Sequence, residues 1–254
     1  MRLRILGCGT SSGVPRIGND WGRCDPNEPK NRRTRASILI SADDVSILVD
    51  TGPDLRQQLL DAEVGRVDQV IWTHEHADHC HGIDELRQLY FALDGPVPCH
   101  ARPRTLEEIT ARFHFAFRGK GPYPAYAQGF ELPDRTQFGS VTVSVGDMPH
   151  GPITTAGLRF EHRGKSIAYT TDFTGLPAKA FECVEKADIW VVDALRRREH
   201  PTHPHLAQVL DWIGKTRPGR AILTHMDQSM DYRTLLSELP EGVEPGYDGM
   251  EIEL

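Results

Sequence analysis

The segment 71–79 reads Ile-Trp-Thr-His-Glu-His-Ala-Asp-His and places three histidines and an aspartate directly after an apolar run typical of a buried strand. A lone histidine is usually a packed or surface residue, but four such polar groups in one short segment would be costly to bury without a ligand. In extended backbone His74 and His76 point the same way and could bind one ion, while Asp78 and His79 could reach a second. The spacing therefore predicts two adjacent metal ions.

Four ligands cannot fill two coordination shells, so the hypothesis requires further donors downstream. Three candidates each follow a predicted strand: His150 after 141–145, Asp172 after 166–169 and His225 after 221–224. Each of them alone is explained equally well as a capping or core histidine or as a turn aspartate. Together with the first four, they would complete two metal sites.

The elements that must position these donors alternate between strands and helices along the whole chain. Strands are expected at 3–7, 37–40, 46–49, 69–72, 140–145, 158–162, 166–169, 189–192 and 221–224, and helices at 54–62, 83–93, 103–113, 204–215 and 232–238. Gly and Pro at 95–98 predict a break between two helices. The tail, 243–247 and 250–253 joined by Asp248-Gly249, has the pattern of a β-hairpin. The sequence predicts one layered α/β domain over residues 1–254.

Composition and charge narrow the function classes. The chain has 254 residues, 39% of them hydrophobic, so its core needs no structural metal and any ion would serve chemistry. Lys and Arg number 29 and Asp and Glu 36, which gives a net charge of −7 and disfavours a general nucleic-acid binder. The basic runs at 32–35 and 196–198 could contact phosphate, but solvated charged faces are the simpler interpretation.

Cysteine usage and apolar patterning indicate the compartment. Five scattered cysteines without a Cys-X-X-Cys pair are typical of a reducing environment. The first residues lack a long apolar stretch, and no segment approaches the roughly 18 apolar residues of a membrane span. We therefore expect a cytoplasmic location without membrane association.

Residues 113–130 gather aromatic side chains around Arg118 and Lys120. The aromatic residues are Phe113, Phe115, Phe117, Tyr123, Tyr126 and Phe130. Core packing or a dimer contact would explain them. The alternative is a lid insertion over an anionic substrate that Arg118 and Lys120 would bind.

The pattern His-X-His-X-Asp-His at 74–79 resembles the metal-binding motif of the metallo-β-lactamase superfamily. The segments 7–15, 50–52 (Asp-Thr-Gly) and 247–251 extend the resemblance over nearly the whole chain. Within that superfamily the chain is similar to the phosphodiesterase branch that includes phosphoribosyl 1,2-cyclic phosphate phosphodiesterase. The implied fold is a four-layer αββα sandwich.

The resemblance implies specific roles for the donors. It places His74, His76 and His150 on one ion and Asp78, His79 and His225 on the other, with Asp172 bridging the two. Zn²⁺ is the expected metal and Mn²⁺ the alternative. His203 aligns with the histidine that protonates the leaving group, and we expect His203 and Asp78 to be catalytic. His205 replaces an acidic residue of the relatives and is a candidate for substrate binding. Alternatively, the stretch 200–206 is a loop that caps the following helix.

The expected reaction is hydrolysis of small cyclic or linear phosphodiesters, of nucleotide or phosphoribosyl type, by a hydroxide that bridges two metals. One alternative is a ribonuclease of the tRNA 3′-processing type, and another is a non-catalytic, metal-containing nucleotide sensor. The expected partner is a small nucleotide-like substrate and no stable nucleic acid, and the resemblance implies a homodimer. Relatives in this branch hold a structural zinc with a cysteine cluster, but this chain has only Cys24 in that region, so we predict none.

Overall fold

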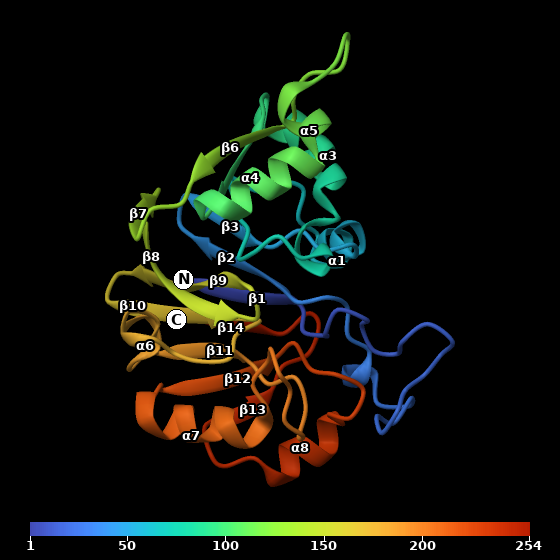
Figure 1. Ribbon diagram of the computed structural model, residues 1–254, viewed down its shortest axis with the longest axis vertical. Helices are drawn as coiled ribbons and strands as arrows, with labels where there is room; N and C mark the ends of the chain where they lie inside the picture. Colours follow the sequence, from blue (N-terminus) through green and yellow to red (C-terminus); the bar gives the residue numbers. More distant parts are fainter.

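Two seven-stranded sheets pack face to face in the computed structural model, which describes residues 1–254, and each sheet carries helices on its outer side (Figure 1). The strand order is β14-β1-β2-β3-β4-β5-β6 in the first sheet and β13-β12-β11-β10-β9-β8-β7 in the second. This arrangement is the four-layer αββα sandwich of the metallo-β-lactamase fold, so the expected fold class is confirmed.

The elements have the following bounds. The first sheet contains β1 (Arg2–Gly7), β2 (Ser37–Ala42), β3 (Val45–Val49), β4 (Gln69–Ile71), β5 (Val97–Ala101), β6 (Ala127–Glu131) and β14 (Glu251–Glu253). The second contains β7 (Arg135–Phe138), β8 (Val141–His150), β9 (Ile153–His162), β10 (Lys165–Thr170), β11 (Ile189–Asp193), β12 (Arg220–Thr224) and β13 (Val243–Pro245). The helices are α1 (Leu55–Asp61), α2 (Ala77–Cys80), α3 (Leu86–Leu93), α4 (Pro103–Arg112), α5 (His114–Arg118), α6 (Ala178–Val184), α7 (Leu206–Thr216) and α8 (Tyr232–Glu238).

Alternation of apolar side chains builds the layers. Ile38 and Ile40 of β2 belong to the core between the sheets, whereas Leu39 between them packs in a second core with residues of α1, α3, α4 and α5. Successive side chains of a strand point to opposite faces, so a strand that is apolar at every position is covered on both sides. Strands β5, β6 and β7 and the short helices α5 and α6 lie where the sequence predicted no such elements. In β5, Pro98 had indicated a break.

The predicted C-terminal hairpin is wrong. Strand β13 pairs in parallel with β12 of the second sheet, while β14 pairs antiparallel with β1 of the first. The intervening Asp248 accepts hydrogen bonds from the backbone N–H groups of Cys8 and Thr34 and from the Thr34 hydroxyl. The Asp-Gly turn therefore crosses from one sheet to the other, because its carboxylate caps two neighbouring chain segments.

The parallel strands position the site. β3 and β4 are parallel in the first sheet, and β10, β11 and β12 are parallel in the second. Parallel strands bring their carboxyl ends to one edge, where polar groups from distant parts of the chain can meet.

All five cysteines are free and buried. No helix has the length and apolar character needed to cross a membrane.

Candidate metal centre

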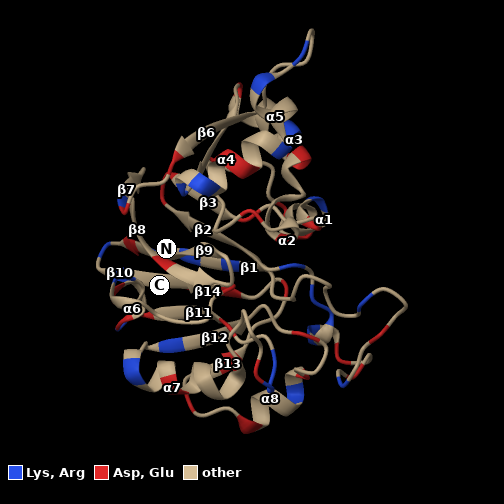
Figure 2. Cartoon of the chain, in the orientation of Figure 1, with Lys and Arg blue, Asp and Glu red and all other residues tan.

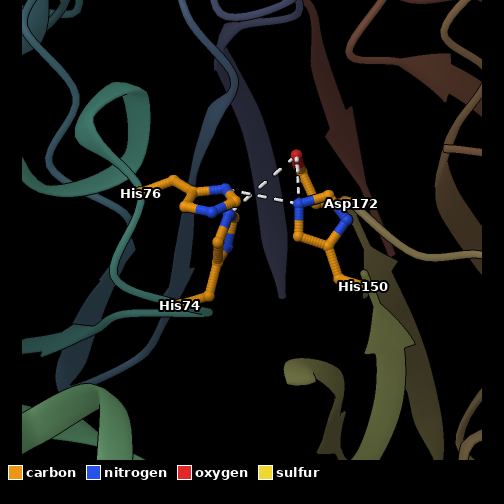
Figure 3. A group of neighbouring side chains, drawn as sticks. All are labelled: His74, His76, His150 and Asp172. Atoms are coloured by element: carbon orange, nitrogen blue, oxygen red, sulfur yellow. Dashed lines mark hydrogen bonds and ion pairs between the residues drawn. The ribbon is translucent and has the colours of Figure 1, made fainter. Parts of the chain in front are cut away.

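Donor side chains from three parts of the chain meet at this edge. Figure 3 shows His74, His76, His150 and Asp172 turned toward one another, and their ligand atoms all lie within 4.8 Å. His74 and His76 lie in the loop after β4, His150 ends β8, and Asp172 follows β10. Residues about 100 positions apart in the sequence thus form one cluster of a size that a single metal ion can occupy.

A second cluster contains Asp78, His79 and His225, also within 4.8 Å. Asp172 lies between the two clusters. Its Oδ1 lies 3.9 Å from His74 Nε2 and 3.7 Å from His150 Nε2. Its Oδ2 lies 3.2 Å from His79 Nε2 and 3.5 Å from His225 Nε2. The structure therefore brings all seven predicted ligands together, with one oxygen of Asp172 directed to each set.

Buried nitrogen atoms in these clusters have no hydrogen-bond partner. The Nε2 atoms of His74, His79 and His225 are enclosed and make no hydrogen bond within the protein. Buried polar atoms are almost always paired, so three orphaned imidazole nitrogens around one carboxylate require a ligand. Imidazole and carboxylate together are a donor set for divalent ions such as Zn²⁺ or Mn²⁺. The residues fit divalent metal.

The electrostatics of the clusters agree with this donor set. Burial and the neighbouring His79 hold the pKa of His74 well below its usual value. Although burial opposes it, His225 and His79 lower the pKa of Asp172 well below the usual range. Against burial, Asp172 raises the pKa of His225 to about 9. A bound cation would supply the positive charge that protonated imidazoles supply here.

Two aspartates accept hydrogen bonds from histidines of this region. Their role was not predicted from the sequence. Asp50 Oδ2 lies 2.7 Å from His79 Nδ1, and Asp193 Oδ2 lies 3.0 Å from His203 Nδ1. Asp193 also accepts a hydrogen bond from the backbone N–H of Asp172. Carboxylates that orient metal-ligating histidines fix both the ring and its tautomer. Their position in the sequence could have indicated this role, because Asp50 follows the apolar strand β3 and Asp193 ends β11.

The backbone is left-handed at three residues of this region. Asp50, Asp172 and His225 have φ angles of 65°, 56° and 54°. Such a conformation costs a non-glycine residue about 1 kcal/mol or more, and it persists only where the surroundings impose it. Each of these residues lies within two positions of the end of a strand, where the chain turns sharply and directs the side chain toward the cluster.

The structure places His203 beside the second cluster. Its ring stacks on that of His225, with centroids 5.0 Å apart and planes 9° apart, and its side chain is 12% exposed. His203, Asp172, Asp193 and His225 have ligand atoms within 4.8 Å of one another. His205, by contrast, precedes α7, where its backbone pairs with Arg196, and its side chain makes no hydrogen bond.

Arg118 ends α5, and Lys120 lies in the loop that follows it. We call residues 113–126 the arm: α5 and the loop after it, which extends away from the sheets in Figure 1. The arm and α3 enclose a cavity of about 390 Å³ lined by Arg87, Tyr90, Phe91, Phe115, Lys120, Tyr123, Pro124 and Tyr126. No metal ligand lines this cavity.

Cys80 and His81, which follow the motif, contact neighbouring residues of the protein. The Cys80 thiol donates to the carbonyl of His76 at 3.1 Å, and the ring of His81 packs against Phe113. Cys24 contacts the guanidinium of the buried Arg33 at 3.9 Å. Neither cysteine belongs to a cluster of candidate metal donors.

Comparison with known proteins gives concordant results. Residues 46–226 match the family described as the beta-lactamase superfamily domain. A diphosphatase of the PhnP family has a TM-score of 0.90 and 30% identity, with 100% of this chain and 97% of that chain covered. An octanoyltransferase from Porphyromonas gingivalis is 34% identical over 99% of this chain, and a ribonuclease Z from Kineococcus radiotolerans is 36% identical over 78%. This chain spans only 51% and 60% of the length of these two relatives. The chain belongs to the beta-lactamase superfamily.

Proposed function

We propose that this protein is a dinuclear, metal-dependent phosphodiesterase that acts on small cyclic or linear phosphodiesters of nucleotide or phosphoribosyl type. One observation carries the proposal: Asp172 lies between two donor clusters, and His203 stands beside one of them. Two adjacent cation sites next to a proton donor are the requirements for cleaving a phosphodiester whose leaving group is a poor one.

The ligands divide into two sets in this proposal. His74, His76 and His150 hold one ion, Asp78, His79 and His225 hold the other, and Asp172 serves both. Bound divalent ions supply Lewis-acid polarisation of a phosphoryl oxygen and a water of lowered pKa. The protein's own part is to hold the imidazoles in the orientation that an ion requires, which is the role of Asp50 at His79 Nδ1.

His203 is the proposed proton donor to the leaving alkoxide. Asp193 engages its Nδ1, so Nε2 is the nitrogen free to donate. A carboxylate partner stabilises the charged imidazole and fixes its orientation, which prepares the ring to give up a proton as the phosphorus–oxygen bond breaks. Asp78, which faces both His79 and His225, is proposed as a catalytic ligand on the same side.

The names of relatives support phosphorus–oxygen bond cleavage. Diphosphatase and ribonuclease both denote enzymes that break such a bond, and these relatives match this chain over 100% and 78% of its length. The octanoyltransferase is about twice as long as this chain, so its activity is not carried over.

A ribonuclease of the tRNA 3′-processing type is the second candidate, and the arm favours it. The arm has two cationic side chains, Arg118 and Lys120, and no carboxylate, although the whole chain carries a net charge of −7. Figure 2 shows the loop after α5 with blue segments and no red ones. Exposed Tyr123 adds an aromatic face on which a base could stack.

One assay panel separates these functions. Purified protein loaded with Zn²⁺ or Mn²⁺ is tested on bis-p-nitrophenyl phosphate, on 2′,3′-cyclic and linear nucleotide diesters, on a diphosphate and on a precursor tRNA. We expect turnover of small diesters. Cleavage of precursor tRNA alone would establish the ribonuclease, cleavage of the diphosphate alone would exclude a diesterase, and turnover of nothing would indicate a binding protein.

A further inference from the structure

Glu75 lies inside the metal-binding motif, between His74 and His76, but its carboxylate contacts helix α4 rather than the donor cluster. Its Oε2 accepts a hydrogen bond from the Thr105 hydroxyl at 3.1 Å, and its Oε1 lies 3.7 Å from Arg104 Nε. Alternate side chains of extended backbone face opposite sides, so Glu75 necessarily points away when the two histidines point inward. Both Glu75 and Thr105 are buried.

The main chain of the same segment is also tied to α4. The carbonyl of Glu75 accepts a hydrogen bond from Arg112 Nη1 at 2.7 Å, and a weaker one from the Cys80 thiol at 3.4 Å. Arg104 in addition donates to the carbonyl of Pro152 at 3.2 Å, two residues beyond His150. One helix thus contacts both segments that carry the ligands of the first cluster.

We infer that Glu75 is a positioning residue, which with Thr105 holds His74 and His76 in the orientation that the first metal ion requires. The inference rests on the proposed metal site at His74, His76 and His150 and not on the identity of the substrate. Changes in residues that orient metal ligands typically cost about 10- to 100-fold in metal affinity. Asp78, His79 and His225 make no hydrogen bond to α4, so the second ion keeps its affinity when Glu75 is changed.

The test is metal binding to the metal-free, full-length protein. Titration with Mn²⁺ is followed by calorimetry and titration with Co²⁺ by the visible spectrum, which reports the geometry of the ligands. Glu75→Ala and Thr105→Val are expected to weaken one of two ions by about 10-fold or more and to leave the other within about threefold. Glu75→Gln keeps an acceptor for Thr105 and is expected to stay near the wild type. Glu108→Gln removes an exposed carboxylate from the same helix and is the matched control.

The outcomes discriminate between explanations. If Glu75→Ala and Thr105→Val bind both ions as the wild type does, the inference is overturned. It is also overturned if both ions weaken equally and the unfolding midpoint of the metal-free protein falls, since that pattern marks a general loss of structure. Thr105→Val replaces the hydroxyl with a methyl group and keeps the shape of the side chain. Its metal affinities therefore test the inference if Glu75→Ala does not fold. A wild type that binds both ions and hydrolyses no phosphodiester refutes the proposed function and leaves this inference standing.

Discussion

The ring of His203 lies parallel to that of His225, 5.0 Å away, so the proposed proton donor stacks directly on a proposed metal ligand. Asp193 Oδ2 lies 3.0 Å from Nδ1 of the His203 ring and also accepts a hydrogen bond from the backbone N–H of Asp172. The donor and the bridging ligand are therefore positioned by one buried carboxylate. This connection lets the role of His203 be tested apart from metal binding.

Replacing His203 with alanine should leave both ions in place and reduce activity according to the leaving group. A general acid typically contributes about 10²- to 10⁴-fold, and it matters most for an alkoxide, which needs the proton. We expect a large loss on alkyl-type diesters and a small one on p-nitrophenyl diesters. The measurement is kcat/KM on both substrates together with metal content. Equal losses on both substrates would contradict the acid role.

Asp172→Asn should lower metal content as well as rate. The carboxylate lies within 4 Å of ligand nitrogens from both clusters, and a neutral amide offers only one oxygen and places an N–H₂ group toward the other set. We expect affinity for at least one ion to fall by about 10- to 100-fold. Metal analysis after dialysis measures this. Asp211→Asn removes an exposed carboxylate and serves as the comparison; full metal content in Asp172→Asn would refute a bridging role.

The cluster was predictable because its members follow strands. His150, Asp172 and His225 were predicted as ligands because each follows a predicted strand and the first four donors cannot fill two metal sites. The same rule covers Asp50 and Asp193, but their role was not predicted, because a single carboxylate after a strand has many explanations and its partner is visible only in space.

The wrong prediction of the C-terminal hairpin has a long-range cause. Asp248-Gly249 has the composition of a hairpin turn, yet its strands join different sheets because Asp248 caps Cys8 and Thr34, which lie more than 200 positions away. Long-range contacts of this kind leave no trace in local patterns.

The double variant Arg118→Ala/Lys120→Ala tests whether the arm acts on small substrates. Lys120 lines the aromatic cavity beside α3, and that cavity includes no metal ligand. We expect kcat/KM on bis-p-nitrophenyl phosphate to stay within about twofold, because both side chains are exposed and removing their charges changes mainly screened electrostatics. A larger loss would mean that the arm closes over the site when substrate binds. A loss confined to precursor tRNA would favour the ribonuclease.

Asp248→Asn should flatten the dependence of stability on pH between about 4 and 6. Burial raises the pKa of Asp248 to about 6, against the hydrogen bonds from Thr34 and Cys8 that lower it. The folded state then binds this proton more tightly than the unfolded chain, so its contribution to stability is complete below pH 4 and declines as pH rises to 6. Allowing for its partial exposure, the decline amounts to roughly 2 kcal/mol.

The measurement is the free energy of unfolding in urea at several pH values, with metal-free wild type and variant compared by slope. The variant also loses an acceptor for the Thr34 N–H, so its absolute stability falls at every pH and only the slope is diagnostic. All other carboxylates contribute equally to both proteins and cancel in the difference. Identical slopes from pH 4 to 6 would show that Asp248 titrates as an ordinary surface carboxyl.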